Sequence, residues 1–209
     1  MSEDAPAAGA ARPGGRTART RAAVLDAVLG ELEDAGYGGL TMERVAERSG
    51  VHLATLYRRW RNAEGLVADL LAEVGTREVP IPDTGSLEGD LRALAAGIAG
   101  LYARPRYRAL VEGMVAAAVR SPAAAAALSE VFAGRNRLAG AIVERAAERG
   151  EVPPGTDAAA VSAAVGAPFY YRLLIQRGPV DGALAATAAA AACAAARSGV
   201  FAPPADQAP

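Results

Sequence analysis

The apolar residues of this chain recur at intervals of three and four along most of its length. One such stripe lies in the first quarter and another near the middle: Val24, Leu25, Val28, Leu29 and Leu32, then Leu87, Leu91, Leu94, Ile98 and Leu101. This spacing places side chains on one face of an α-helix, whereas a half-buried strand needs strict alternation. No alternating run of β-branched residues is present, so the sequence predicts an all-α fold.

Glycine and proline divide this helical pattern into about nine segments. Breaks fall at 36–39, 49–50, 80–85, 104–105, 121–122, 153–155 and 178–179, and such residues end helices through their special backbone conformations. We therefore expect helices over 17–35, 41–48, 52–58, 62–79, 87–103, 106–119, 122–149, 156–177 and 180–197. A chain of 209 residues can bury a sizeable core without disulfides or metals.

The charged residues are unevenly distributed, although the whole chain carries a formal net charge of only −1. Residues 12–61 contain nine arginines and six acidic residues, a net +3, whereas residues 62–209 contain thirteen arginines and fifteen acidic residues, a net −2. A basic end on a mildly acidic body is typical of a protein that presents one end to phosphates.

Scarce residue types disfavour several other classes of protein. Cys193 is the single cysteine, so no intrachain disulfide can form and a reducing compartment, the cytoplasm, is expected. His52 is the single histidine, which leaves no His-rich metal site and no Ser-His-Asp set, and we expect neither metal nor cofactor. The first residues do not resemble a secretory signal, and charged residues flank the alanine-rich runs, so we expect no membrane partner.

Residues 40–60 have the local pattern of two short helices joined by a tight corner. The Thr41 hydroxyl can cap the first helix, and Arg44 follows in its first turn. Val45 belongs to the inward face of that helix. Gly50 stands where the helix must end with a left-handed residue, and Val51 fills the corner.

The second helix of this pair carries a basic surface. Leu56 and Trp60, four residues apart, face inward, which leaves the other sides of the helix to solvent. A helix held in this way fits the major groove of duplex DNA, with its N-terminal residues near base edges and its arginines near phosphates. The outward residues are His52, Leu53, Thr55, Arg58 and Arg59, followed by Arg61.

Residues 36–66, from Gly-Tyr-Gly-Gly-Leu-Thr-Met through Ser-Gly-Val-His-Leu-Ala-Thr-Leu-Tyr-Arg-Arg-Trp to Ala-Glu-Gly-Leu, resemble the signature of the TetR (tetracycline repressor) family. With a preceding helix from about Thr17, the resemblance covers residues 16 to about 72. It implies a helix-turn-helix domain that binds DNA as part of a transcriptional regulator. The implied phosphate contacts are Thr41 and Tyr57, the base-facing set is His52, Leu53, Ala54 and Thr55, and Arg44, Arg58, Arg59 and Arg61 complete the candidate DNA-binding residues.

Three positions depart from the family pattern. Trp60 replaces the common Phe, and His52 replaces the common Ser. Ala63 stands where most members carry a Lys that contacts phosphate at the start of the fourth helix. We expect Arg61, or the helix amides that follow the good N-cap residue Asn62, to replace that contact.

The C-terminal part is similar to a subset of the same family, in which the last two helices pair with their symmetry mates as a four-helix dimer bundle. Residues 168–175 read Pro-Phe-Tyr-Tyr-Arg-Leu-Leu-Ile, and Gly178 and Pro179 follow. The last helix offers small and apolar residues at three- and four-residue spacing, a face that lets a partner helix approach. The candidate dimerisation residues are Leu184, Ala188, Ala191 and Ala195.

In the TetR family a ligand pocket lies among helices four to eight, and the body aromatics of this chain fall in that region. An apolar cavity with a few hydroxyls suits a hydrophobic or aromatic small molecule. The candidate lining residues are Tyr102, Tyr107, Met114, Phe132, Phe169, Tyr170 and Tyr171. Each of them has ordinary core packing as its alternative.

These features predict a homodimeric regulator, most simply a repressor that a small effector releases from a near-palindromic operator. We expect disordered tails at 1–15 and 200–209, the helix-turn-helix domain at 16–61 and the ligand-binding and dimerisation domain at 62–199. An activator or ligand-free regulator of the same fold stays open. A helical enzyme is the alternative from another class, but no Gly-rich phosphate loop, carboxylate pair or metal spacing supports it.

Overall fold

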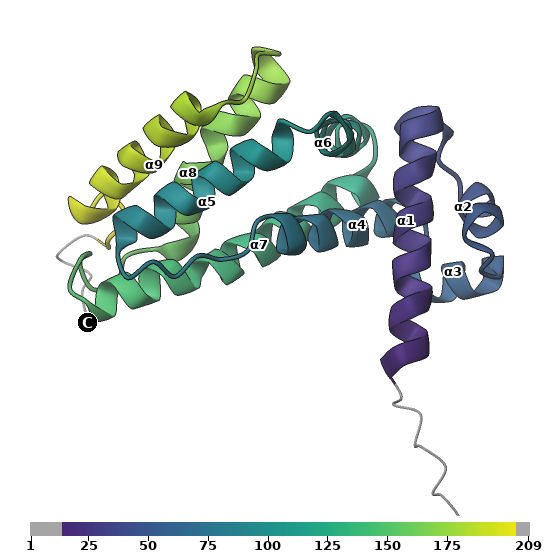
Figure 1. Ribbon diagram of the computed structural model, residues 1–209, viewed down its shortest axis with the longest axis horizontal. Helices are drawn as coiled ribbons and strands as arrows, with labels where there is room; N and C mark the ends of the chain where they lie inside the picture. The colour runs from purple at the N-terminus through teal and green to yellow at the C-terminus, as the bar shows by residue number, and fades with distance from the viewer. Residues whose placement is uncertain (1–13, 204–209) are drawn as a thin grey trace, which may run out of the picture.

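The computed structural model describes residues 14–203, and within this range helices are joined only by turns and short loops. Figure 1 shows α1 standing across one end of an elongated body, with α2 and α3 on its outer side. The elements are α1 (Gly14–Gly39), α2 (Met42–Ser49), α3 (Leu53–Trp60), α4 (Ala63–Glu78), α5 (Leu87–Tyr102), α6 (Pro105–Ala118), α7 (Pro122–Glu148), α8 (Ala158–Tyr170), the π-helical η1 (Tyr171–Ile175) and α9 (Gly182–Arg197). The all-α prediction is confirmed for the described residues.

Local sequence signals determine most of the helix ends. The Ser86 hydroxyl accepts a hydrogen bond from the Gly89 amide at 3.1 Å, and the Asp181 carboxylate accepts one from the Leu184 amide at 2.9 Å. Each cap satisfies an amide that the first helical turn leaves unpaired. Six of the predicted breaks coincide with junctions between elements, and at the seventh Gly36 interrupts α1 with φ 65° and ψ 179°.

The helix predicted over 156–177 is divided into α8 and η1. Pro168 lies inside α8 and has no amide to donate to the carbonyl four residues earlier. After Pro168 the backbone hydrogen bonds connect residues five apart instead of four, as in a π-helix: the Gln176 amide donates to the Tyr171 carbonyl at 3.1 Å. A wider turn of this kind changes the direction in which the following side chains point.

One continuous apolar core extends from the first three helices, α1 to α3, into the body formed by the later helices. In the body, α5 packs against α9, and α7 lies between α4 and α8. Helix α4 packs against α1 on one side and against α7 on the other. It therefore joins the two parts of the chain, and Figure 1 shows it leading from the end of α3 into the body.

One segment of the body is long and apolar enough, by length and composition alone, to cross a membrane. It is Ala158–Ile175, 18 residues with a mean hydropathy of 1.3. In the structure this segment packs against α7 and α9, with Val161, Val165, Phe169 and Leu173 fully buried. Only 22% of the segment is buried within the single chain, so one apolar side of α8 has no covering element among the described residues.

Phe201 packs against the body, although it lies in the disordered tail expected over 200–209. The Asp157 amide donates to the Phe201 carbonyl at 2.8 Å, and the Phe201 ring packs against the core. At the other end, α1 begins at Gly14, just inside the tail expected over 1–15. The rest of both expected tails, 1–13 and 204–209, lies outside the described residues.

Candidate functional site

The corner between α2 and α3 is built by residues that each have a local role. The Thr41 hydroxyl accepts a hydrogen bond from the Arg44 amide at 3.2 Å and so caps α2. Gly50 follows α2 with φ 67°, a conformation that side chains with a Cβ adopt only at a cost. Val51 packs against the core. These contacts hold α3 at a fixed angle to α2.

The inward side of α3 anchors it to the rest of the domain. Leu56 is fully buried, and Trp60 is 7% exposed. The Arg59 guanidinium lies 5.0 Å from the centre of the Trp60 ring, within range of a cation–π contact. The helix is therefore rigidly held, as a helix that reads DNA must be.

The outward side of α3 carries the residues that the sequence assigned to DNA. Tyr57 is 44% exposed. Among the described side chains of residues 14–61, four arginines have no carboxylate within 4 Å: Arg19, Arg58, Arg59 and Arg61. The last three closely follow Tyr57 in the chain. The exposed candidates are Thr41, Arg44, His52, Ala54, Tyr57, Arg58, Arg59 and Arg61, while Leu53 and Thr55 are half-buried. The face is basic and open to solvent.

Arg44 differs from the other arginines of this face because its guanidinium is already paired. Its Nε donates to Glu31 of α1 at 2.5 Å, and Arg48 donates to the second oxygen of the same carboxylate at 2.7 Å. These hydrogen bonds hold the pKa of Glu31 below its usual value, and the bond from Arg44 has the larger effect. Arg44 thus joins α2 to α1. Its charge is already balanced by Glu31, whereas that of Arg58 is not paired with a carboxylate of the described residues.

The Tyr57 hydroxyl, the implied phosphate contact, donates a hydrogen bond to Glu43 at 3.1 Å. The Glu43 backbone amide and then this hydroxyl lower the pKa of the Glu43 carboxyl. A carboxylate beside the expected phosphate position repels the DNA backbone. In the structure, the Tyr57 hydroxyl is already used by a carboxylate of α2.

The junction between α3 and α4 is tighter than the sequence suggested. Asn62 caps α4 as predicted, since its side-chain oxygen accepts from the Gly65 amide at 2.9 Å. A Cβ built on Gly65 would lie 2.3 Å from the Trp60 carbonyl oxygen. Only glycine fits here, because that contact is far below the van der Waals distance and the obstacle is backbone.

A half-buried ion-pair network reinforces this junction, and sequence reasoning missed it. Asp69 of α4 accepts hydrogen bonds from Trp60 Nε1 at 2.8 Å and from two nitrogens of Arg21 at 3.0 and 2.6 Å. Arg21 also donates to Glu73 at 2.6 Å. Burial raises the pKa of Asp69, but the bonds from Arg21 and Trp60 outweigh it and leave that pKa below its usual value.

One sequence signal could have indicated this network. Asp69 and Glu73 are four residues apart and therefore share one face of α4. Two carboxylates on one face of a mostly apolar helix predict a basic partner, because carboxylates that pack against other helices need a compensating charge. The sequence alone does not say that this partner is Arg21, which lies 48 residues away from Asp69.

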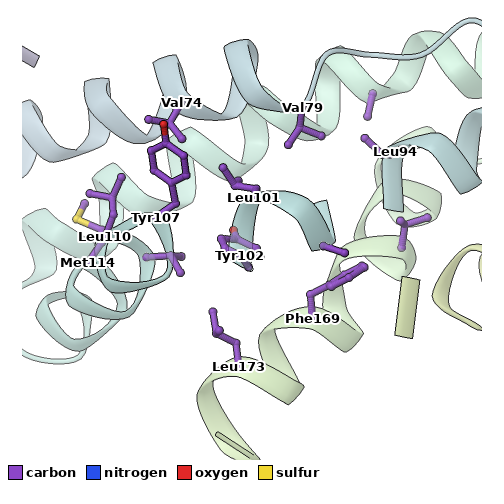
Figure 2. Packing of buried hydrophobic residues seen from close by; sticks show 14 of the residues in the cluster. Val74, Val79, Leu94, Leu101, Tyr102, Tyr107, Leu110, Met114, Phe169 and Leu173 are labelled. Atoms are coloured by element: carbon purple, nitrogen blue, oxygen red, sulfur yellow. The ribbon is translucent and has the colours of Figure 1, made fainter. Parts of the chain in front are cut away.

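An interior cavity of about 310 Å³ lies among α4, α5, α6, α7 and α8. Figure 2 labels seven of its lining side chains: Val74, Val79, Leu94, Leu101, Tyr102, Tyr107 and Leu110. Four of the seven candidate ligand residues line it: Tyr102, Tyr107, Phe132 and Tyr170. Helix α4 contributes Leu71, Val74 and Gly75 to its wall.

The aromatic side chains of the interior cavity contact one another. The rings of Tyr102 and Phe132 both meet Tyr170 edge to face, with ring centres 5.9 and 5.2 Å apart. The hydroxyls of Tyr102 and Tyr170 form a hydrogen bond at 3.1 Å. Burial raises the pKa of both phenols, that of Tyr170 more strongly, so both are neutral at physiological pH.

Three candidate ligand residues do not line the interior cavity. Met114 is fully buried, and its sulfur accepts from the Tyr37 hydroxyl of α1 at 3.8 Å. Phe169 is fully buried in the core, and Tyr171 is 57% exposed. Successive helical residues point about 100° apart, so only one member of a run such as Phe169, Tyr170 and Tyr171 faces the cavity.

The candidate dimerisation residues of α9 lie on different sides of the helix. Ala188 is 3% exposed and packs within the chain, where α9 contacts α5 and α8. The prediction that Ala188 belongs to a dimer face is therefore wrong, because its side chain is buried within its own chain. Leu184 and Ala195 are half-buried, and Ala191 is exposed. The stripe that the sequence suggested for a partner helix is used in part by the chain's own body.

Within residues 14–203 no group of three or more His, Cys, Asp or Glu side chains is placed to hold a metal ion. Cys193 is 4% exposed among the alanines of α9, and burial raises the pKa of its thiol.

Two family models match this chain. Residues 24–70 match the bacterial regulatory proteins of the tetR family, and residues 81–192 match the tetracyclin repressor-like C-terminal domain. The chain is 36% identical over 151 residues to the HTH-type transcriptional regulator AqdR of Rhodococcus erythropolis, covering 72% of each chain. It is 28% identical over 156 residues to the uncharacterized HTH-type transcriptional regulator YdeS of Bacillus subtilis, covering 75% of this chain and 79% of that one.

Among solved structures, the TetR family transcription regulator SCO0332 superposes with a TM-score of 0.73 and 30% sequence identity. The match covers 84% of this chain and 97% of that one. The helix-turn-helix geometry, both family models and these relatives agree, and the chain belongs to the TetR family of DNA-binding transcriptional regulators.

Proposed function

We propose that the chain is a homodimeric repressor that a small effector, bound in the interior cavity, releases from a near-palindromic operator. One observation carries this proposal. Helix α4 supplies Leu71, Val74 and Gly75 to the cavity wall, and the N-terminal half of the same helix is joined to α3 through Asp69 and Gly65. A ligand that displaces the cavity wall acts on the element that positions the recognition helix.

The energetic demand on such an effector is modest. Coupling between two sites is typically about 1–3 kcal/mol, which changes operator affinity by roughly 5- to 150-fold. The ligand must bind the two positions of α4 with affinities that differ by this amount, since equal binding to both shifts nothing.

A homodimer through α8 and α9 follows from the uncovered apolar side of the body. TetR family regulators act as dimers, and in this chain Tyr171 is 57% exposed and Ile175 69% exposed at the end of that region. A two-fold dimer presents two copies of α3 to successive turns of the major groove, about 34–36 Å apart. The operator is therefore a near-palindrome.

The residues proposed to contact DNA fall into two groups. The exposed N-terminal end of α3, with His52 and Ala54, is placed for base edges, together with the half-buried Leu53 and Thr55. Phosphates are contacted by Thr41, Tyr57, Arg58, Arg59 and Arg61, and Arg61 takes over from the lysine that Ala63 replaces.

DNA binding is tested with a labelled fragment of the gene's own upstream region, by fluorescence anisotropy over a range of salt concentrations. The wild-type dimer should bind more weakly as salt rises, because bound arginines displace counterions from the DNA. Arg58→Ala should weaken binding and lower the salt slope by about two, since each of two subunits loses one phosphate contact. Arg120→Ala, on an exposed arginine of the body, is the matched control and should change neither.

Two results would contradict the proposal. A folded dimer that binds no upstream fragment at low salt would refute the operator. Unchanged affinity in Arg58→Ala would show that α3 does not face DNA.

The proposal includes no catalytic activity and no metal or cofactor, and it places the protein in the cytoplasm, where bacterial DNA lies. Activation instead of repression is distinguished by deleting the gene: transcription of the target rises on deletion of a repressor and falls on deletion of an activator.

A further inference from the structure

The interior cavity contains a cationic side chain without a counter-charge. Arg135 of α7 is half-buried in the cavity wall. One of its terminal nitrogens donates to the Val79 carbonyl at 2.8 Å, and no carboxylate of residues 14–203 lies within 4 Å of its guanidinium. Of the other described arginines that are half-buried, three have carboxylate partners and Arg172, outside the cavity, donates to the Pro179 carbonyl at 3.4 Å; the three are Arg21, Arg108 and Arg145.

The remaining polar groups of the cavity also present donors. One hydrogen bond joins the hydroxyls of Tyr102 and Tyr170, so one of these two protons remains free to donate. The side-chain oxygen of Asn136 accepts from Ser162 at 3.0 Å, which leaves its NH₂ group available. The third lining tyrosine, Tyr107, already donates its hydroxyl proton to Glu78 at 3.1 Å. No Asp or Glu is among the residues that line the cavity itself.

The rest of the wall is apolar. Apart from its polar residues, the lining consists largely of Leu, Val, Ile, Ala and Phe side chains; the polar ones are Arg135, Asn136, Ser162 and the three tyrosines Tyr102, Tyr107 and Tyr170. A volume of about 310 Å³ is at the small end of the range for small-molecule sites. The cavity therefore matches a small ligand with a long or broad apolar part and one compact acceptor group.

We propose that the effector is an organic acid: an apolar body carrying one carboxylate, or a comparably compact delocalised anion, whose oxygens are bound by Arg135 and by the free tyrosine proton. This assignment rests on the proposed function only in identifying the cavity ligand with the effector.

Physical chemistry favours an anion here over a neutral polar ligand. Partial burial removes water from the guanidinium and lowers the pKa of Arg135. A half-buried charge without a partner is costly, and a carboxylate restores both charge and hydrogen bonds. Arginine binds carboxylates through two parallel N–H donors, which makes these bonds stronger than neutral ones.

The experiment uses pairs of probes that differ only in charge: hexanoate, octanoate and decanoate against the corresponding alkanamides. Binding to the full-length dimer without DNA is measured by isothermal titration calorimetry. Four proteins are compared: the wild type, Arg135→Met, which keeps the length but removes the charge, Arg135→Lys, which keeps the charge, and Arg137→Met, which removes an exposed arginine from the same helix.

We expect wild-type protein to bind at least one carboxylate about tenfold or more tightly than its amide, a difference of about 1.4 kcal/mol. Arg135→Met should bind both probes equally, Arg135→Lys should keep part of the preference, and Arg137→Met should keep all of it. Equal affinity of carboxylate and amide for the wild type, a preference that survives Arg135→Met, or no binding of any carboxylate would each overturn the proposal. The comparison of probes on the wild type decides the matter even if Arg135→Met fails to fold.

A second measurement separates this proposal from the proposed function. The same probes are added to the complex of the protein with its upstream DNA fragment, and release is followed by anisotropy. Arg135-dependent carboxylate binding without release leaves the anion site intact and contradicts effector-driven release. Equal release by carboxylates and amides supports release and refutes the anion assignment.

Discussion

Replacing Asp69 by Asn tests the junction between the DNA-binding helices and the body. Asp69 accepts three hydrogen bonds, one from Trp60 and two from Arg21, at 2.6–3.0 Å. Asn offers one uncharged oxygen in place of the carboxylate, so the paired charge and at least one bond are lost. Arg21 keeps Glu73 as a partner, which limits the damage.

The expected magnitude follows from the exposure of the pair. The side chains of Arg21 and Asp69 are 27% and 26% exposed, between exposed pairs worth about 0–1 kcal/mol and buried pairs whose disruption costs about 3–5 kcal/mol. We expect Asp69→Asn to lower the free energy of unfolding by about 2 kcal/mol, and the Tm by about 4–8 °C for a chain of this size.

The assay is urea and thermal unfolding followed by circular dichroism at a fixed protein concentration, because dimer stability depends on concentration. Asp34→Asn is the matched control: Asp34 pairs with Arg48 at 2.7 Å, but its side chain is 60% exposed, and the loss should be below about 1 kcal/mol. Equal losses in the two variants, or no loss in Asp69→Asn, would refute the reasoning.

The pH dependence provides a second check on the same variant. The pKa of Asp69 is lowered in the folded state, so its stabilisation is complete above the ordinary aspartate pKa of about 4 and is lost as the pH falls through the lowered value. The difference between wild type and Asp69→Asn should be constant from about pH 7 to pH 5 and shrink below about pH 4. A difference that grows on acidification would contradict the assigned sign.

Three further outcomes are expected. Gly65→Ala should destabilise the protein by more than about 2 kcal/mol and weaken operator binding, because its Cβ meets the Trp60 carbonyl oxygen at 2.3 Å. Gly100→Ala is the control: Gly100 lies on the exposed side of α5 with nothing within 4 Å of its Cβ position, and the change should stabilise the protein by about 0.5–1 kcal/mol in unfolding experiments. The same sign for both variants would contradict the packing. Cys193, buried and with a raised pKa, should react with a thiol reagent slowly in native protein and rapidly in urea, and fast native labelling would place it at the surface. Glu78 has its pKa lowered to about 2 by Arg104, Arg77 and Tyr107, so its stabilising contribution should be complete above about pH 4.5 and disappear toward about pH 2, and Glu78→Gln should remove that part of the acid dependence in a pH titration of stability.

The helix-turn-helix could be predicted from sequence because its determinants are local. Thr41, Gly50, Leu56 and Trp60 lie within twenty residues of one another, and each acts on the backbone next to it or on the facing helix of the same short unit. Capping, left-handed termination and a four-residue apolar spacing depend on neighbours along the chain. For the same reason the predicted breaks agree with the observed helix junctions.

The interior cavity was predicted only in part, because a residue's direction on a long helix depends on how several helices pack. Tyr170 lines the cavity, while its neighbours Phe169 and Tyr171 enter the core and the solvent respectively. All three are equally aromatic in the sequence, and about 100° of helical rotation separates each from the next. The position of α8 against α7 and α9 decides which of them lines the cavity.

The all-α class, most of the helix ends and the helix-turn-helix could be predicted from the sequence, since these depend on residues close together in the chain. Tertiary structure alone decided the contacts between distant helices: Asp69 with Arg21 across 48 residues, Arg44 paired with Glu31, and Arg135 in the cavity wall without a carboxylate partner in residues 14–203. The physical reason is that charge pairing and burial depend on distance in space. That distance is set only when the helices pack.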